Sequence, residues 1–169
     1  ELIDIIPVFN LYEEYWKIYT KSDILPPQYI SADSMIERSI IGEGTEVYGE
    51  VINSVIGAGV TIAKGAVVRD SIIMQGSVIG ASTEVNKAII PENVHVGANV
   101  KLGVGEYAPS TYDQKVYQFD LVTIGENSVI PDGVQVGKNT AIAGETTVGD
   151  YPDGLLASGN YIIKAGGAR

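Results

Sequence analysis

The chain has 169 residues, is 45% apolar, and carries a formal net charge of −10 with only 11 Lys and Arg residues. These basic residues are scattered along the sequence, which argues against a nucleic-acid partner, because binding to a phosphate backbone depends on clustered Lys and Arg. There is no cysteine, which excludes disulfides and thiolate metal sites. No apolar run reaches the length of a membrane helix, and we expect a cytoplasmic protein with one elongated domain.

Residues 1–30 precede the repeat described below and are rich in aromatic side chains. Asn10 can cap a short helix, although an extended strand is the alternative for residues 16–20. Pro26 and Pro27 end any helix that reaches them. We therefore expect residues 1–30 to be a linker segment that caps the first coil of the repeat, with a contact to a neighbouring domain as the alternative.

From residue 31 onward, aliphatic residues recur at intervals of six, six and five, so that a unit of 17 residues repeats. The positions expected to point inward in the first block are Ile56, Ile62, Val68, Ile73, Ile79, Val85, Ile90, Val96 and Leu102. A four-residue pattern repeats with them, as Arg-Ser-Ile-Ile at 38–41, Asn-Ser-Val-Ile at 53–56, Asp-Ser-Ile-Ile at 70–73 and Lys-Ala-Ile-Ile at 87–90. This hexapeptide spacing predicts an all-β fold, a parallel β-helix over residues 31–169. Strands of a sandwich or barrel recur about every eight to twelve residues with hairpin signals between them, which this block lacks.

The pattern stops after Leu102. Residues 103–120 contain no hexad, and we interpret them as a long loop that leaves a corner of the β-helix, a kind of loop that is commonly functional. The candidate site for contact with another domain or with an effector consists of Tyr107, Tyr112, Lys115 and Tyr117. After the loop, inward positions are expected at Ile124, Ile130, Val136, Ile142 and Val148, followed by a last strand at residues 161–163.

His95 is the single histidine, and acetyltransferases built on hexapeptide coils commonly use one histidine as a general base. Strand alternation places Val94 and Val96 inward and His95 outward, where a solvated side chain is the simpler interpretation. We find no pair of a catalytic acid and a base among the carboxylates at turn or outward positions, which are Glu43, Glu46, Glu50, Glu84 and Glu92. Gly-Val-Gly-Glu at 103–106 lacks the Lys-Ser/Thr of a phosphate loop. We therefore assign no catalytic, cofactor-binding or metal-binding residue.

Several stretches are similar to one known family: Phe-Asn-Leu-Tyr at 9–12, Trp-Lys-Ile-Tyr-Thr at 16–20, Leu-Pro-Pro-Gln-Tyr-Ile at 25–30, Gly-Glu-Val-Ile-Asn-Ser-Val-Ile at 49–56 and Asp-Ser-Ile-Ile-Met at 70–74. They resemble the C-terminal part of bacterial glucose-1-phosphate adenylyltransferases, also called ADP-glucose pyrophosphorylases. The resemblance extends over nearly the whole chain, including the loop. Hexads also occur in acyltransferases, so the stretches that precede the repeat make the match specific.

The resemblance implies a parent enzyme that joins ATP and glucose 1-phosphate into ADP-glucose and pyrophosphate, with Mg²⁺, in glycogen biosynthesis. It implies that ATP and Mg²⁺ are used by an N-terminal catalytic domain outside this chain, so the chain alone is expected to be inactive and without a cofactor. It further implies that the β-helix is left-handed, packs against the catalytic domain, helps to build a homotetramer and contributes to the binding of a sugar-phosphate or nucleotide effector.

One departure from the family concerns regulation. Some members place an aspartate and a basic residue where this chain has Pro-Glu-Asn at 91–93, and Glu92 cannot replace a cation that faces phosphate. The identity of an effector is therefore left open. Two alternatives also stay open. The first is a free-standing hexapeptide acyltransferase that works as a trimer and binds its acceptor between coils near His95. The second is a non-catalytic subunit paralogous to the catalytic one.

Overall fold

The computed structural model describes residues 3, 4, 8, 11, 13–15, 24–151 and 153–164. The expected cap Asn10 and the alternative strand at residues 16–20 lie outside the described residues. Within the described part of the chain, no helix is long and apolar enough to cross a bilayer.

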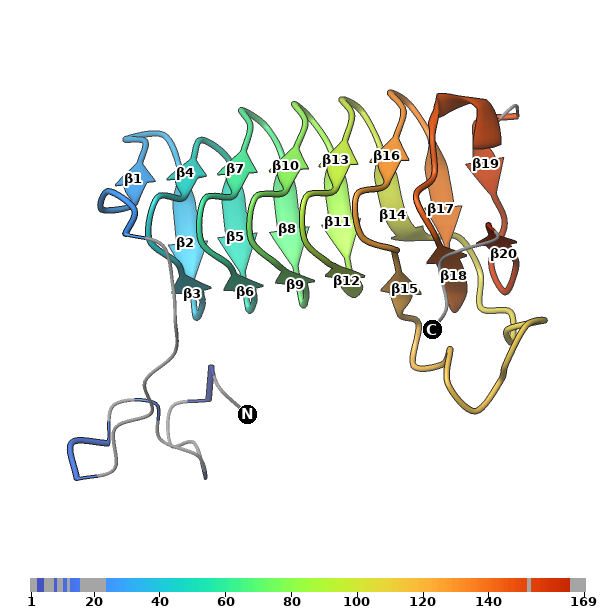
Figure 1. Cartoon of the computed structure of the whole chain (residues 1–169), viewed down its shortest axis with the longest axis horizontal. Coiled ribbons are helices and arrows are strands. Elements are labelled where there is room, and N and C mark those ends of the chain that lie inside the picture. Colours follow the sequence, from blue (N-terminus) through green and yellow to red (C-terminus); the bar gives the residue numbers. More distant parts are fainter. Residues whose placement is uncertain are drawn as a thin grey trace.

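The strands form three parallel sheets, which we call A, B and C, and Figure 1 shows them as the sides of one β-helix. Each passage from sheet A through B to C completes one coil. Sheet A contains β1 (Tyr29–Ile30), β4 (Glu46–Val47), β7 (Thr61–Ile62), β10 (Val78–Ile79), β13 (His95–Val96) and β16 (Val129–Ile130). Sheet B contains β2 (Met35–Glu37), β5 (Glu50–Ile52), β8 (Val67–Arg69), β11 (Glu84–Asn86), β14 (Lys101–Val104), β17 (Gln135–Gly137) and β19 (Leu155–Leu156). Sheet C contains β3 (Ile40–Ile41), β6 (Val55–Ile56), β9 (Ile72–Ile73), β12 (Ala88–Ile90), β15 (Val122–Thr123), β18 (Thr140–Ala143) and β20 (Tyr161–Ile163).

This architecture confirms the β-helix that the hexapeptide spacing predicts. Successive side chains along a strand alternate between its two faces, so that one aliphatic residue of each short strand points to the axis. In sheet A, for example, Ile62 pairs with Ile79, and Ile79 pairs with Val96 in the next coil. The inward positions predicted between residues 56 and 102 are each at most 1% exposed. The core is therefore a continuous aliphatic column, in which each fully buried side chain contributes about 1.5–3 kcal/mol.

A ladder of serine hydroxyls lines the corner between sheets B and C. The Oγ of Ser39 accepts a hydrogen bond from the backbone N–H of Ser54 at 3.1 Å, and the Oγ of Ser54 accepts one from the N–H of Ser71 at 3.1 Å. The Oγ of Ser71 accepts one from the N–H of Ala88 at 3.0 Å. Alanine has no hydroxyl, so the ladder ends at Ala88. The next coil is the one from which the long loop emerges.

The structure corrects the last predicted hexad. The hexapeptide spacing predicts an inward Val148, but this residue begins a short 3-10 helix (η1, Val148–Asp150) and is 63% exposed. Tyr151 is buried in its place, with 7% exposure, and its hydroxyl donates to Oγ1 of Thr146 at 3.0 Å. A 3-10 turn advances less per residue than a strand, so the inward position is displaced along the sequence. The predicted last strand is present as β20, paired with β18.

Candidate functional site

The long loop leaves sheet B at the end of β14 and returns to sheet C at the start of β15, so it occupies a corner between sheets B and C. Figure 1 shows it projecting from the β-helix near its C-terminal end, on the side of β18 and β20. The corners of the two following coils, at residues 138–139 and 157–160, connect the same two sheets. The loop is therefore placed to cover these corners.

Polar groups fix the loop to the last two coils. The backbone N–H and the hydroxyl of Thr111 both donate to the carbonyl of Gly159, at 2.8 Å each. Asn139, which is 1% exposed, connects both ends of the loop: its Nδ2 donates to the carbonyl of Ala108 at 2.8 Å, and its Oδ1 accepts from the N–H of Asp120 at 2.8 Å. We call this side chain the Asn139 clamp. The loop is thus held mainly by hydrogen bonds rather than by burial of its aromatic rings.

An ion pair and a close backbone contact add to this attachment. Nζ of Lys87 lies 3.6 Å from Oδ2 of Asp120, and because both side chains are partly exposed the pair contributes little to stability. A Cβ at Gly159 would collide with the carbonyl oxygen of Pro109. Glycine at this corner therefore lets the loop approach the backbone of the last coil.

Tyr112 and Tyr117 of the loop and Tyr161 of β20 have adjoining rings, and we call these three residues the tyrosine cluster. The ring centroids of Tyr112 and Tyr117 are 5.9 Å apart with an interplanar angle of 48°, and those of Tyr112 and Tyr161 are 5.0 Å apart at 44°. These tilted arrangements are favourable for aromatic pairs. Tyr112 and Tyr161 remain 49% and 47% exposed. The cluster therefore presents aromatic surface to solvent.

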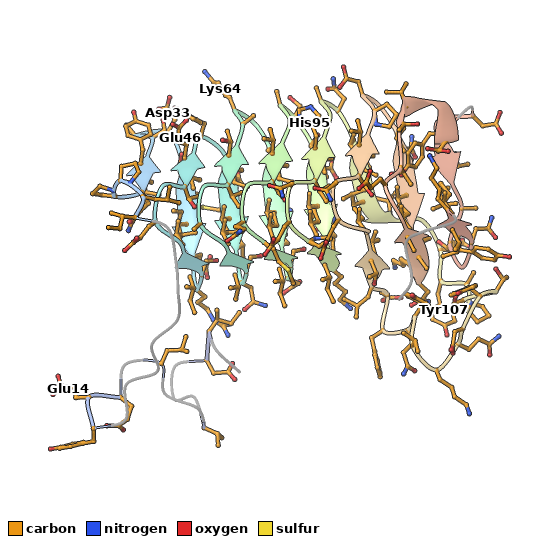
Figure 2. The ribbon with its side chains drawn as sticks, in the orientation of Figure 1. Glu14, Asp33, Glu46, Lys64, His95 and Tyr107 are labelled. Carbon is orange, nitrogen blue, oxygen red and sulfur yellow. The ribbon has the colours of Figure 1, made fainter. Side chains whose placement is uncertain are left out.

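Of the four residues that the sequence singled out, the structure brings two together, Tyr112 and Tyr117. Tyr107 is 67% exposed and lies at the start of the loop (Figure 2). The side chain of Lys115 is exposed, and its backbone N–H donates to Oδ1 of Asp113 at 2.8 Å. Sequence reasoning missed Tyr161. The alternation of inward and outward side chains along residues 161–163 was the signal that could have identified it. An inward Ile162 turns Tyr161 outward on the sheet to which the loop returns.

The remaining candidates lie elsewhere and apart from one another. His95 is exposed on sheet A, as predicted, and its partners in the neighbouring strands are the aliphatic residues Val78 and Val129. Two of the outward carboxylates have surface ion-pair partners, Glu50 with Arg69 and Glu84 with Lys101, at 3.5 Å each. Figure 2 shows His95 and Glu46 projecting from the surface of separate coils. This arrangement contains no pairing of His95 with a carboxylate across the sheet.

Two further observations bear on ligand chemistry. Among the described residues, no group of three or more His, Cys, Asp or Glu side chains comes together in a way that could hold a metal ion. In the same part of the chain, every buried side-chain nitrogen or oxygen has a hydrogen-bond partner. The described residues therefore contain no ready-made cluster of metal-binding side chains, and their buried side-chain polar atoms are already paired.

Asp150 and Tyr151, near the C-terminal end of the β-helix, have perturbed pKa values. The hydrogen bond from Nζ of Lys164 to Oδ2 of Asp150, at 2.9 Å, is the main cause that lowers the pKa of Asp150, and a second hydrogen bond from the N–H of Thr147 acts in the same direction. Burial raises the pKa of Tyr151 to about 12. Asp150 ties Lys164, the residue that follows β20, to η1, and Tyr151 lies in the core, so both groups serve the structure.

Comparison with known proteins identifies what this chain is similar to. A family model described as "GlmU-like, C-terminal hexapeptide" matches residues 28–120. A glucose-1-phosphate adenylyltransferase from Lachnospira eligens is 65% identical over 166 residues, which are 98% of this chain and 39% of that protein. The enzyme of the same name from Acetivibrio thermocellus is 40% identical over the same share of each. The resemblance inferred from the motifs is confirmed, and the chain spans 39% of the length of these relatives.

Among solved structures, the acetyltransferase domain of PglB from Neisseria gonorrhoeae has a TM-score of 0.48 at 20% identity, over 78% of this chain and 55% of that one.

Proposed function

We propose that this chain, which belongs to the family of GlmU-like C-terminal hexapeptide proteins, is the β-helix portion of a glucose-1-phosphate adenylyltransferase. The observation that carries the proposal is the 65% identity over 98% of the chain to an adenylyltransferase from Lachnospira eligens. In this proposal the parent enzyme forms ADP-glucose and pyrophosphate from ATP and glucose 1-phosphate, in glycogen biosynthesis.

The chemistry of the parent lies in a part of the protein outside this chain. ATP and Mg²⁺ are assigned to a catalytic domain of the parent, and this is supported by the chain spanning only 39% of the length of its adenylyltransferase relatives. This chain alone is then inactive. The test is an assay of the purified chain with ATP, glucose 1-phosphate and Mg²⁺, in which no ADP-glucose is expected. Formation of ADP-glucose by the chain alone would refute this division of roles.

The role proposed for the chain is assembly and regulation. Its partners are its own catalytic domain and other subunits of a homotetramer, and a sugar phosphate or nucleotide is the class of effector. The loop is proposed as a contact region within the parent, through Tyr107, Tyr112, Lys115 and Tyr117. What supports this is that hydrogen bonds hold the loop, while Tyr107 and Tyr112 stay 67% and 49% exposed. The adjoining rings of Tyr112, Tyr117 and Tyr161 make part of this aromatic surface contiguous, as in an interaction site.

A loop variant of the full-length parent tests this contact. Replacing residues 105–120 by a short glycine-serine linker is expected to change the oligomer size or the response to effector, measured by analytical ultracentrifugation and by the steady-state rate. The matched control is Tyr48→Ala, which removes a tyrosine that is 36% exposed on another corner. If the loop variant keeps both the oligomer size and the effector response, the loop is not a contact region.

A further inference from the structure

Two tyrosines and a glutamate lie together on the outer face of sheet A, at the N-terminal end of the β-helix where Figure 1 shows β1 and β4. Val47 is fully buried, so its neighbours in the chain, Glu46 and Tyr48, both point outward. Tyr29 of β1 is the cross-strand partner of Glu46 in β4. We call Tyr29, Glu46 and Tyr48 the tyrosine–glutamate site.

The two rings of this site reach solvent and are close enough to share one ligand. Their centroids are 5.6 Å apart with an interplanar angle of 46°, so the rings are tilted rather than stacked face to face. Tyr29 is 55% exposed and Tyr48 is 36% exposed. A cation is attracted to the face of a tyrosine ring when it lies within about 6 Å of the ring centroid. One cation beside both rings can therefore satisfy this limit for each of them.

A hydrogen bond holds the glutamate beside the rings. The hydroxyl of Tyr48 donates to Oε2 of Glu46 at 3.1 Å. This bond is the main cause that raises the pKa of Tyr48, so the hydroxyl keeps its proton and continues to donate at neutral pH. Among the residues that the structure describes, none donates a hydrogen bond to the other oxygen, Oε1. The carboxylate therefore has one oxygen available to a ligand.

The following coil does not supply a cation to Glu46. On sheet B, Glu84 forms an ion pair at 3.5 Å with its cross-strand partner in the following coil, Lys101. On sheet A, the corresponding partner of Glu46 is the neutral residue Thr61. No ion pair within the described part of the chain includes Glu46. Sheet B thus compensates the charge of Glu84 internally, whereas the charge of Glu46 is open to a cation from outside.

We propose that the tyrosine–glutamate site binds a small organic cation that carries a guanidinium or alkylammonium group. The cation lies over the two rings and pairs with Oε1 of Glu46. A guanidinium group suits both contacts, because it stacks on aromatic faces and donates hydrogen bonds to a carboxylate. The net charge of −10 favours the approach of a cation. This ligand is opposite in charge to the sugar phosphate or nucleotide proposed as effector, so the two need different sites.

An NMR titration of the chain with butylguanidinium at neutral pH tests the site. The amide resonances of Glu46 and Thr61 are expected to shift and to saturate, whereas butylurea, a neutral analogue of similar shape, should shift neither. Glu46→Gln and Tyr29→Leu should each weaken binding about two- to fivefold, the effect of one exposed cation–π contact or surface ion pair. The matched controls are Glu92→Gln and Tyr107→Leu, which alter an exposed carboxylate and an exposed ring elsewhere and should leave the affinity unchanged.

Four results would overturn the site. In the first, butylguanidinium gives no saturable shift. In the second, butylurea binds as tightly as butylguanidinium, which would assign the contact to apolar packing alone. In the third, Glu46→Gln loses no more affinity than Glu92→Gln, which would assign the attraction to the overall charge of the chain. In the fourth, a capped Gly-Arg-Gly peptide binds far more tightly than butylguanidinium, which would assign the site to an arginine of a partner protein.

Circular dichroism checks that each variant is folded. The titration uses this chain without the rest of the parent, so its outcome does not depend on the adenylyltransferase proposal.

Discussion

The ring of Tyr112 lies 5.0 Å from the ring of Tyr161, centroid to centroid, and this contact joins the long loop to the last strand of the β-helix. An aromatic pair of this kind contributes about 0.5–1.5 kcal/mol beyond its buried area. We expect Tyr161→Ala to lower the melting temperature slightly and to speed cleavage of the loop in limited proteolysis. Tyr107→Ala is the control, because Tyr107 is 67% exposed on the same loop. Equal cleavage rates in both variants would show that the contact does not hold the loop.

The Asn139 clamp is expected to matter more than this ring contact. Removing its amide leaves the carbonyl of Ala108 and the N–H of Asp120 without partners, which costs about 1–3 kcal/mol when such groups are buried. Asn139 also has a φ of 54°, so alanine there carries backbone strain. Asn99→Ala is the matched control, because Asn99 has a φ of 56° and an exposed side chain at a corner of another coil. Chemical denaturation should show a larger loss for Asn139→Ala, and an equal loss would assign the effect to strain alone.

Adjacent residues in β9 test which face is inward. Ile73 is 1% exposed and Ile72 is 43% exposed. Ile73→Asp buries a charge on the axis of the β-helix, at a cost of several kcal/mol, and is expected to unfold the neighbouring coils. Ile72→Asp keeps the charge in contact with water and is expected to change the free energy of unfolding little. Similar melting curves for the two variants would mean that the inward register is wrong.

Two glycines with the same backbone angle separate a steric requirement from a conformational one. Gly103 and Gly133 both have a φ of 74°. A Cβ at Gly103 would collide with the carbonyl oxygen of Asn86, whereas nothing lies within 4 Å of a Cβ at Gly133. Gly133→Ala is expected to cost about 1–2 kcal/mol from its left-handed backbone. Gly103→Ala should cost clearly more in the same denaturation experiment, and an equal cost would show that the coil can yield at β14.

The ion pair at the C-terminal end gives a pH prediction. The hydrogen bond from Lys164 lowers the pKa of Asp150 below the ordinary value of an aspartate, so the folded state holds this proton less tightly than the unfolded state. The resulting stabilisation is present above the unfolded pKa and is lost as the pH falls through the lower, folded pKa. In an NMR titration, Lys164→Met should raise the pKa of the Asp150 carboxyl. An unchanged pKa would mean that Thr147 alone sets it.

The outcome at the candidate site shows where sequence reasoning ends. The aromatic residues of the loop could be found because they interrupt a regular pattern. Their partner Tyr161 and the Asn139 clamp belong to coils that follow the loop, and a contact between segments so far apart is set by which corners stack on each other. The prediction that Val148 points inward was wrong for a related reason, since a short 3-10 helix displaced the inward position to Tyr151.

The sequence by itself determined the β-helix, the inward column from Ile56 to Leu102, the position of the loop and the outward direction of His95. It could do so because, in a repeating coil, the position of a residue within the repeat decides whether its side chain points to the axis or to solvent. One aliphatic residue of each short strand points to the axis. Only the tertiary structure decided how the loop is attached and that its Tyr112 lies against Tyr161 of the last strand. These features arise from contacts between residues of different coils, and no local sequence pattern specifies which of these residues become neighbours in space.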